Sequence, residues 1–123
     1  MLDLVYDARG HVLTRWPYLH FGQYAMVRRG GAAAHSLAKS PPFPLRLRRP
    51  ADFPAPDPFR PQDFRAEVHL PHYDVVLARG GPPAAVLFAG ATVRPTLAFE
   101  GGGWRAWRTA RGQQAAANAA AAR

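Results

Sequence analysis

Four short stretches of the chain carry hydrophobic patterns that predict β-strands. Leu2–Tyr6 combines aliphatic, β-branched and aromatic side chains and ends at a turn-forming Asp-Ala-Arg-Gly. Tyr73–Arg79 has an apolar centre, which predicts a strand buried on both faces. Ala32–Ala38 follows a glycine pair and favours a short strand, with the start of a helix as the alternative. Leu45–Arg49 alternates with period two between prolines and predicts an edge strand.

The last regular pattern predicts a hairpin. Residues 96–100 and 104–108 both alternate, and Gly101-Gly102-Gly103 separates them. Because successive side chains of a strand point to opposite faces, we expect Leu97 and Phe99 on one face of the first arm.

The main helix is predicted from about Leu19 to Arg29. Its ring-bearing positions Phe21 and Tyr24 fit the i, i+3 spacing of a helix, which is entered through Pro17 and ends at Gly30. These rings are expected to hold the helix onto the sheet, because a small domain must bury most of its aromatic residues.

The chain is long enough for one domain. Helical turns are predicted after Pro61 and at 84–88, which completes a small single α/β domain over residues 1–108. Its mixed sheet is expected to have about four to five strands, with one main helix and the C-terminal hairpin. A proline-rich segment at 40–61 must wrap a core built by other segments. The alanine-rich residues 109–123 lack large apolar side chains and predict a flexible tail or loose helix.

The formal net charge of +8 raises the possibility of a nucleic-acid partner. Residues 1–50 contribute +6 and residues 51–123 contribute +2. The arginines are scattered, apart from Arg28-Arg29 and Arg46-x-Arg48-Arg49. Cysteine is absent, which excludes disulfides and thiolate metal sites. No apolar run approaches the roughly 18 residues that span a bilayer. Charge and composition therefore leave a nucleic-acid role open without favouring it.

Metal and nucleophilic chemistry find little support. His69 and His72 have i, i+3 spacing, but Pro71 breaks the helix that would align their rings, so we expect no metal site and no cofactor. Ser36 and Ser40 lie outside any G-x-S-x-G motif, so they are not predicted as nucleophiles.

Two carboxylates flank predicted strands and are candidates for acid–base work or ligand binding. Asp7 follows the first strand, at the end where α/β sheets usually bind ligands, whereas Asp74 begins its strand. In a parallel arrangement they would lie at opposite ends of the sheet, which favours turn caps and salt bridges to arginine over catalysis. No catalytic residue is predicted.

Single-strand nucleic-acid binding is the alternative for the aromatic segment. Arg28 and Arg29 could contact phosphates while bases stack on an aromatic side chain of this segment, Trp16, Tyr18, Phe21 or Tyr24. The same rings are also what a helix buries against a sheet, and we favour that interpretation.

The ordered motifs also resemble a family. L-V-Y-D-A-R-G-H-V-L, P-Y-L-H-F-G-Q-Y-A-M-V-R-R-G-G, H-Y-D-V-V-L-A-R-G and G-x-W-R-A-W-R occur in this order within residues 2–108. This set resembles the C-terminal soluble domain of uncharacterised bacterial polytopic membrane proteins. Those proteins are similar to mannosyltransferase-like glycosyltransferases of the GT-C type. The chain departs from the family pattern at Gly22, where a proline is expected, and at Leu37, where an aromatic residue is expected.

The resemblance implies a non-catalytic accessory domain whose catalytic partner is a membrane-embedded region of the same full-length protein. It places the domain at the extracytoplasmic membrane face, whereas a free-standing chain would be cytoplasmic. The expected polar binding cluster is His20, Tyr24, Arg28 and Arg29, with Asp7 and Asp74 as further binding candidates. The abrupt start of the first strand at Met1 fits a fragment of a longer gene. The alternative is a small basic nucleic-acid-binding module.

Overall fold

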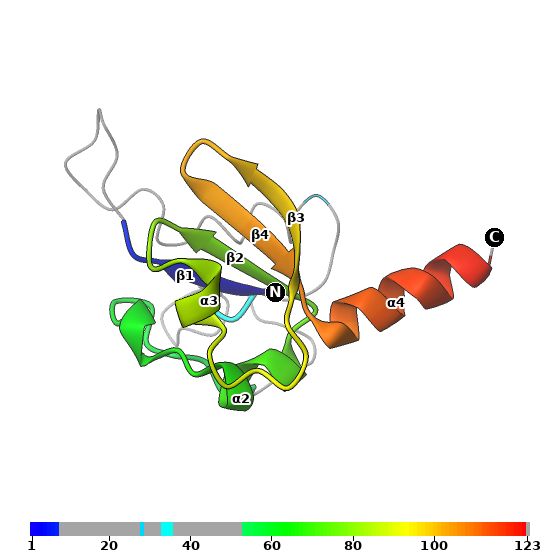
Figure 1. Ribbon diagram of the computed structural model, residues 1–123, viewed down its shortest axis with the longest axis horizontal. Coiled ribbons are helices and arrows are strands. Elements are labelled where there is room, and N and C mark those ends of the chain that lie inside the picture. Colours follow the sequence, from blue (N-terminus) through cyan, green and yellow to red (C-terminus); the bar gives the residue numbers. More distant parts are fainter. Residues whose placement is uncertain (8–27, 29–32, 36–52, 123) are drawn as a thin grey trace, which may run out of the picture.

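A mixed β-sheet organises the molecule. The computed structural model describes residues 1–7, 28, 33–35 and 53–122. Within these residues the sheet has four strands in the order β1 (Leu2–Val5), β2 (Val75–Arg79), β4 (Trp104–Arg108) and β3 (Thr96–Gly101) (Figure 1). The predicted α/β class, the mixed sheet and the C-terminal hairpin are confirmed.

The strand register places the largest buried side chains on one face. β1 runs parallel to β2, with Leu2 opposite Val76 and Leu4 opposite Ala78. β4 runs antiparallel to β2 and places Trp107 opposite Val76. Because directly opposed residues share a face of the sheet, these five side chains form a continuous apolar layer.

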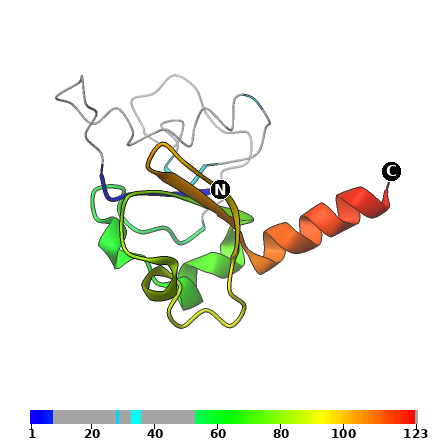
Figure 2. The ribbon, with the colours of Figure 1, turned by 45° about the horizontal axis from the view of Figure 1, so that its top comes forward.

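Short helices cover this layer. They are η2 (Pro61–Asp63), α2 (Ala66–His69), η3 (Leu70–His72) and α3 (Ala84–Leu87), which confirms the helical turns predicted after Pro61 and at 84–88. Figure 2 shows α2 and α3 on the same side of the sheet. A proline stands in the first turn of both η2 and η3, where its missing N–H leaves no helical hydrogen bond unmade.

Aromatic rings fill the space between sheet and helices. Phe88 meets Trp107 edge-on at a centroid distance of 5.1 Å, and Phe64 meets Phe88 edge-on at 6.3 Å. Such pairs contribute about 0.5–1.5 kcal/mol beyond their buried area. Tyr73 is also buried, and its hydroxyl donates to the Pro54 carbonyl at 3.1 Å. The core is therefore aromatic, and the chain before β2 is tied to it.

β2 is less symmetrically buried than its apolar sequence predicts. Val76 and Ala78 are completely buried on the helix-covered face. Val75 and Leu77, on the other face, are only half-buried. The prediction of burial on both faces is confirmed for one face and only partly for the other.

The predicted arrangement of Leu97 and Phe99 is wrong. A register shift in β3 leaves Leu97 opposite Trp107 and Phe99 opposite Ala106, which are consecutive residues of β4. Consecutive strand residues face opposite ways, so Leu97 and Phe99 lie on opposite faces. The extra residue of this bulge cancels the alternation that the sequence suggests.

The sequence predicts a strand at Ala32–Ala38. Residues 33–35, the part of this range that the structure describes, are not in a strand. Ala34 and His35 make a turn, although the Ala34 N–H donates to the Met1 carbonyl at 3.0 Å. A run of alanines presents too little side-chain surface to specify a strand against this competing turn.

The alanine-rich end of the chain forms helix α4 (Ala110–Ala121), which projects away from the sheet (Figure 1). Thr109 caps it, because its hydroxyl oxygen accepts a hydrogen bond from the Gly112 N–H at 3.2 Å. The predicted flexibility of this tail stays a prediction. Among the described residues, no helix is long and apolar enough to cross a membrane.

Several predictions fall outside the described residues. They concern the strand Leu45–Arg49, most of the proline-rich segment and the packing of Phe21 and Tyr24. From the predicted helix Leu19–Arg29 only Arg28 is described, and it is helical and exposed.

Candidate functional site

The two candidate aspartates lie at opposite ends of the sheet, as expected. Asp7 follows the carboxyl end of β1, and Asp74 immediately precedes β2, which is parallel to β1. The structure therefore does not bring Asp7 and Asp74 into one site. Of the other candidates, Arg28 is described as exposed, while His20, Tyr24 and Arg29 lie outside the described residues.

Asp7 is joined to a buried arginine. Its carboxylate lies 3.8 Å from Nη2 of Arg79, whose side chain is only 9% exposed. Nη1 of Arg79 donates to the Gly102 carbonyl at 2.9 Å, and its guanidinium lies 5.7 Å from the ring centroid of Trp104. Arg79 thus links the end of β2 to the hairpin turn. Because Asp7 pairs with this arginine, its carboxylate contributes to the same link.

Asp74 makes the shorter ion pair. Its Oδ1 lies 2.8 Å from Nε of Arg111, in the first turn of α4, and both side chains are about half exposed. The Arg111 guanidinium also lies 5.8 Å from the ring of Phe53, which stacks on His72 at 5.6 Å. This cluster fastens α4 to the segment before β2.

The two closely spaced histidines face different neighbours. His69 is buried, stacks on Phe64 at 5.4 Å, and its Nδ1 lies 2.8 Å from the Arg65 carbonyl oxygen. His72 instead stacks on Phe53 near the surface. Within the described part of the chain, no three histidine or acidic side chains are grouped so that they could hold a metal ion.

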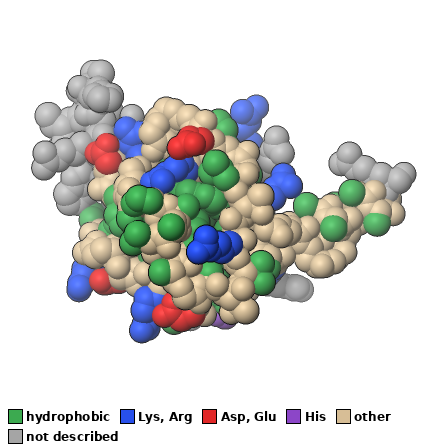
Figure 3. Space-filling model, in the orientation of Figure 1, with side chains coloured by type: hydrophobic (Ala, Val, Ile, Leu, Met, Phe, Trp, Pro, Cys, Tyr) green, Lys and Arg blue, Asp and Glu red, His purple; other side chains and the backbone are tan. Residues whose placement is uncertain are grey.

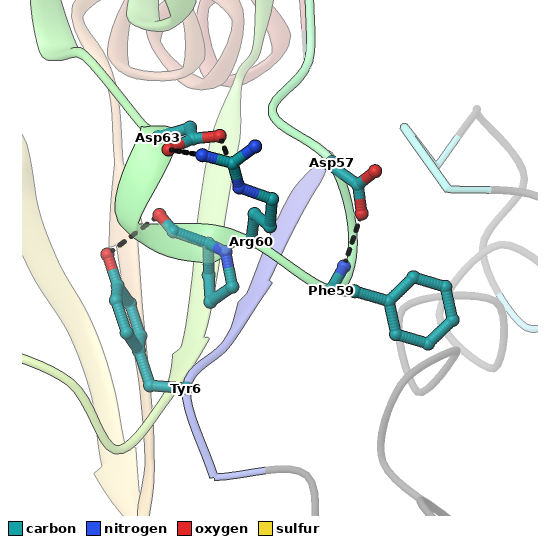
Figure 4. A network of polar contacts seen from close by, with 6 residues as sticks. Tyr6, Asp57, Phe59, Arg60 and Asp63 are labelled. Atoms are coloured by element: carbon teal, nitrogen blue, oxygen red, sulfur yellow. Dashed lines mark hydrogen bonds and ion pairs between the residues drawn. The ribbon is translucent and has the colours of Figure 1, made fainter.

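Two tyrosines have perturbed acidity. Burial, and secondarily the negative charge of Asp3, raises the pKa of Tyr73 to about 12. Burial also raises the pKa of Tyr6. The Tyr6 hydroxyl donates to the Pro61 carbonyl at 3.1 Å and ties β1 to η2 (Figure 4). Both phenols therefore remain protonated at neutral pH and act as hydrogen-bond donors to backbone.

The loop that contacts Tyr6 is braced by its own polar groups (Figure 4). Nε of Arg60 lies 3.1 Å from the Asp63 carboxylate, and the Phe59 N–H donates to the Asp57 carboxylate at 2.7 Å. This hydrogen bond, from a backbone N–H to the Asp57 side chain two residues earlier, forms an Asx turn and fixes the local conformation of the loop.

A further candidate site lies on the helix-covered side of the hairpin, and we call it the α3–β3 surface. Its apolar members are Val86 of α3, 63% exposed, and Leu97 of β3, 49% exposed. Arg94, Glu100 and Arg105 are its charged members. Figure 3 shows hydrophobic side chains gathered near the centre of this face, with basic and acidic side chains beside them.

Arg105 is held in place on the α3–β3 surface. Its Nη2 donates to the carbonyls of Gly80 at 2.8 Å and Pro82 at 3.1 Å. Its guanidinium also lies 5.3 Å from the ring centroid of Trp107. Arginine is enriched at protein interfaces, and exposed apolar groups rimmed by polar groups also mark interaction surfaces.

A pocket of about 210 Å³ lies between α2, η3, the loop after α3 and the start of α4. Its lining is mainly apolar and includes Ala66, Leu70, Pro71, Ala91 and Val93. The ionisable side chains among its lining residues are Glu67 and Arg111. The pocket therefore combines an apolar wall with two charges of opposite sign.

Comparison with known proteins gives no homologue for this chain. No family model, curated protein or solved structure matches it. Sequence reasoning missed both the α3–β3 surface and the pocket. The pocket joins segments that are far apart in the chain, and the surface depends on how α3 folds against the hairpin. The local sequence signal for the α3–β3 surface is the apolar content of β3 next to the arginines of β4.

Proposed function

We propose that the chain is a non-catalytic accessory domain of a membrane glycosyltransferase-like protein. It docks through the α3–β3 surface onto another part of that protein and helps to shape the acceptor site. The family setting rests on the ordered sequence motifs, and the docking surface rests on the structure.

The observation that supports docking is the exposure of Leu97 beside a fixed Arg105. Leu97 lies opposite the buried Trp107 and is itself about half exposed, although it belongs to the helix-covered face. Exposed apolar groups rimmed by polar groups mark interaction surfaces. Arg105 is already ordered by two backbone carbonyls, so docking would cost it little conformational entropy.

The bulge in β3 favours docking by side chains over strand addition. Bulges at a sheet edge disrupt the regular row of backbone groups that an added strand needs. A partner is therefore expected to bury Leu97 and Val86 rather than extend the sheet.

Site-specific photocrosslinking tests this proposal. A photoreactive phenylalanine analogue at position 97, in cells that make the native full-length protein, should form crosslinks that peptide mass spectrometry maps to a segment of the same protein outside this domain. The reading frame upstream of Met1 should encode hydrophobic helices. The same analogue at Gln114, exposed on α4, is the matched control. Equal crosslinking from both positions, or an unrelated upstream gene, would contradict the proposal.

Nucleic-acid binding is the second candidate, and the exposure of Arg94 and Arg108 favours it. Neither guanidinium has an ion-pair partner among the described residues. Binding through phosphates should weaken steeply as salt rises. The double variants R94Q/R108Q and R60Q/R65Q each lower the net charge of +8 by two. If Arg94 and Arg108 form the binding site, R94Q/R108Q should lose more affinity for a single-stranded oligonucleotide than R60Q/R65Q. If the original chain does not bind the oligonucleotide at low salt, nucleic-acid binding is ruled out.

A further inference from the structure

The pocket between α2 and α4 is a second candidate site, distinct from the α3–β3 surface. It is bounded by segments that are separate in sequence: Ala66 and Glu67 of α2, Ala91 to Val93 of the loop, and Ala110 at the start of α4. Its volume of about 210 Å³ is below the roughly 300–1,000 Å³ of sites for drug-sized ligands. The occupant must therefore be small.

The buried part of the pocket lining is apolar, and the buried hydroxyl that lines it is already satisfied. Leu70 and Ala66 are buried. The Thr109 hydroxyl donates to the Tyr73 carbonyl and accepts from the Gly112 N–H, so both of its hydrogen-bonding roles are filled. The floor consequently favours an aliphatic or aromatic group over a sugar or a nucleotide base.

The two charges at the rim are not equivalent. Arg111 is neutralised by Asp74 at 2.8 Å. Glu67 is exposed and has no hydrogen-bond or ion-pair partner among the described residues. The uncompensated side-chain charge of the pocket is therefore negative, although the chain as a whole is strongly basic.

The Glu67 carboxylate lies close to the turn that leads into the pocket wall. Gly90 adopts a positive φ of 82°, and a Cβ added there would lie 3.1 Å from Oε2 of Glu67. The missing side chain thus lets the carboxylate lie against the turn that leads into Ala91 and Val93, which line the pocket.

We infer that this pocket binds a small hydrophobic ammonium ion, with its apolar body on Leu70 and Ala66 and its cation beside Glu67. This site goes beyond the proposed docking function and shares no residue with the α3–β3 surface. The N-terminus of α4 also borders the pocket and carries a partial positive charge, which would favour an anion instead. The experiment must therefore separate these two charges.

Three probes with the same branched carbon skeleton make that separation: 3-methylbutylamine, 3-methylbutan-1-ol and 3-methylbutanoate. Each is titrated into the ¹⁵N-labelled chain and followed by two-dimensional NMR. The amine should shift the amides of Ala66, Leu70 and Ala91 with a millimolar dissociation constant. It should bind about two- to fivefold more tightly than the alcohol, the range that one exposed ion pair provides.

Glu67→Gln should remove the advantage of the amine over the alcohol while leaving alcohol binding unchanged. Glu100→Gln, which removes another exposed carboxylate, is the matched control and should keep that advantage. Equal binding of amine and alcohol by the unmodified chain would overturn the inference. So would preferred binding of 3-methylbutanoate, which would assign the site to the α4 N-terminus, or the absence of shifts at the pocket residues.

Discussion

Replacing Gly112 by alanine should destabilise the domain, although the same replacement in a free helix is stabilising. Gly112 is the buried residue of α4, and it lies against the backbone of Asp74. A Cβ at this position would sit 2.9 Å from the Asp74 carbonyl carbon. The Asp74 carbonyl oxygen would lie closer still and would overlap the new Cβ. Normal carbon–carbon contact needs about 3.5 Å or more, so α4 must move away by more than about 0.6 Å.

The cost of that movement can be worked out from the contacts it disturbs. Overpacking of this kind costs about 1–3 kcal/mol. The movement also stretches the hydrogen bond from the Thr109 N–H to the Asp74 carbonyl, which is 3.1 Å long, and its weakening adds a cost of about 1 kcal/mol. Alanine regains about 1 kcal/mol from helix propensity. The net expectation is a loss of about 1–3 kcal/mol in the free energy of unfolding.

Urea denaturation followed by tryptophan fluorescence measures this loss, because Trp107 is buried in the core. Ala117→Gly on the exposed part of α4 is the matched control, since it exchanges the same two residues in the opposite direction. Helix propensity alone predicts opposite signs for the two variants, whereas close packing predicts that both lose stability. A Gly112→Ala variant as stable as the original chain would refute the packing argument.

Three further predictions concern the same framework. Thr109→Val removes a helix cap and a buried hydrogen bond and should cost about 2–3 kcal/mol in urea denaturation, whereas Thr109→Ser should retain most of the stability. Arg105→Lys should cost about 1 kcal/mol because lysine cannot reproduce the planar contacts to Gly80 and Pro82, and Arg94→Lys should be neutral. Because the folded-state pKa of Tyr73 is about 12 and the unfolded value is about 10, its stabilising effect is complete below pH 10 and is lost as the pH rises through 12. Denaturation between pH 9 and 11.5 should show a smaller decline for Tyr73→Phe than for the original chain.

The strands could be predicted because their information is local. β1, β2 and the first arm of the hairpin each carry a short apolar or alternating run that is followed by a turn-forming segment, so pattern and turn chemistry agree. The bulge in β3 could not be predicted, since it depends on how Leu97 and Phe99 pair with β4. The turn at Ala34 depends likewise on a hydrogen bond to Met1, a contact that no local pattern encodes.

Helix α4 is a different case, because two residues, Thr109 and Gly112, fix the position of an otherwise alanine-rich segment. Alanine has the highest helix propensity, but an isolated helix of 12 residues is marginal in water. Thr109 begins the helix with a side-chain cap, and Gly112 allows it to approach Asp74 closely. Sequence composition predicts a flexible tail or a loose helix and cannot decide between them, because the close approach to Asp74 exists only once β2 and β4 are adjacent.

The candidate site was harder to predict because charged residues have several structural uses. Arg79 and Arg111 pair with the two aspartates that the sequence offered as ligand-binding groups. Arg105 is engaged by backbone carbonyls, so its charge is also committed within the fold. Net charge therefore overstates what this domain can offer to a polyanion. Arg94 differs from these arginines because it makes no ion pair with the described residues, and it lies two residues before β3, the strand that carries the exposed Leu97. Any partner that recognises this face must meet an aliphatic group and a guanidinium together, which favours a folded protein surface over a uniform phosphate backbone.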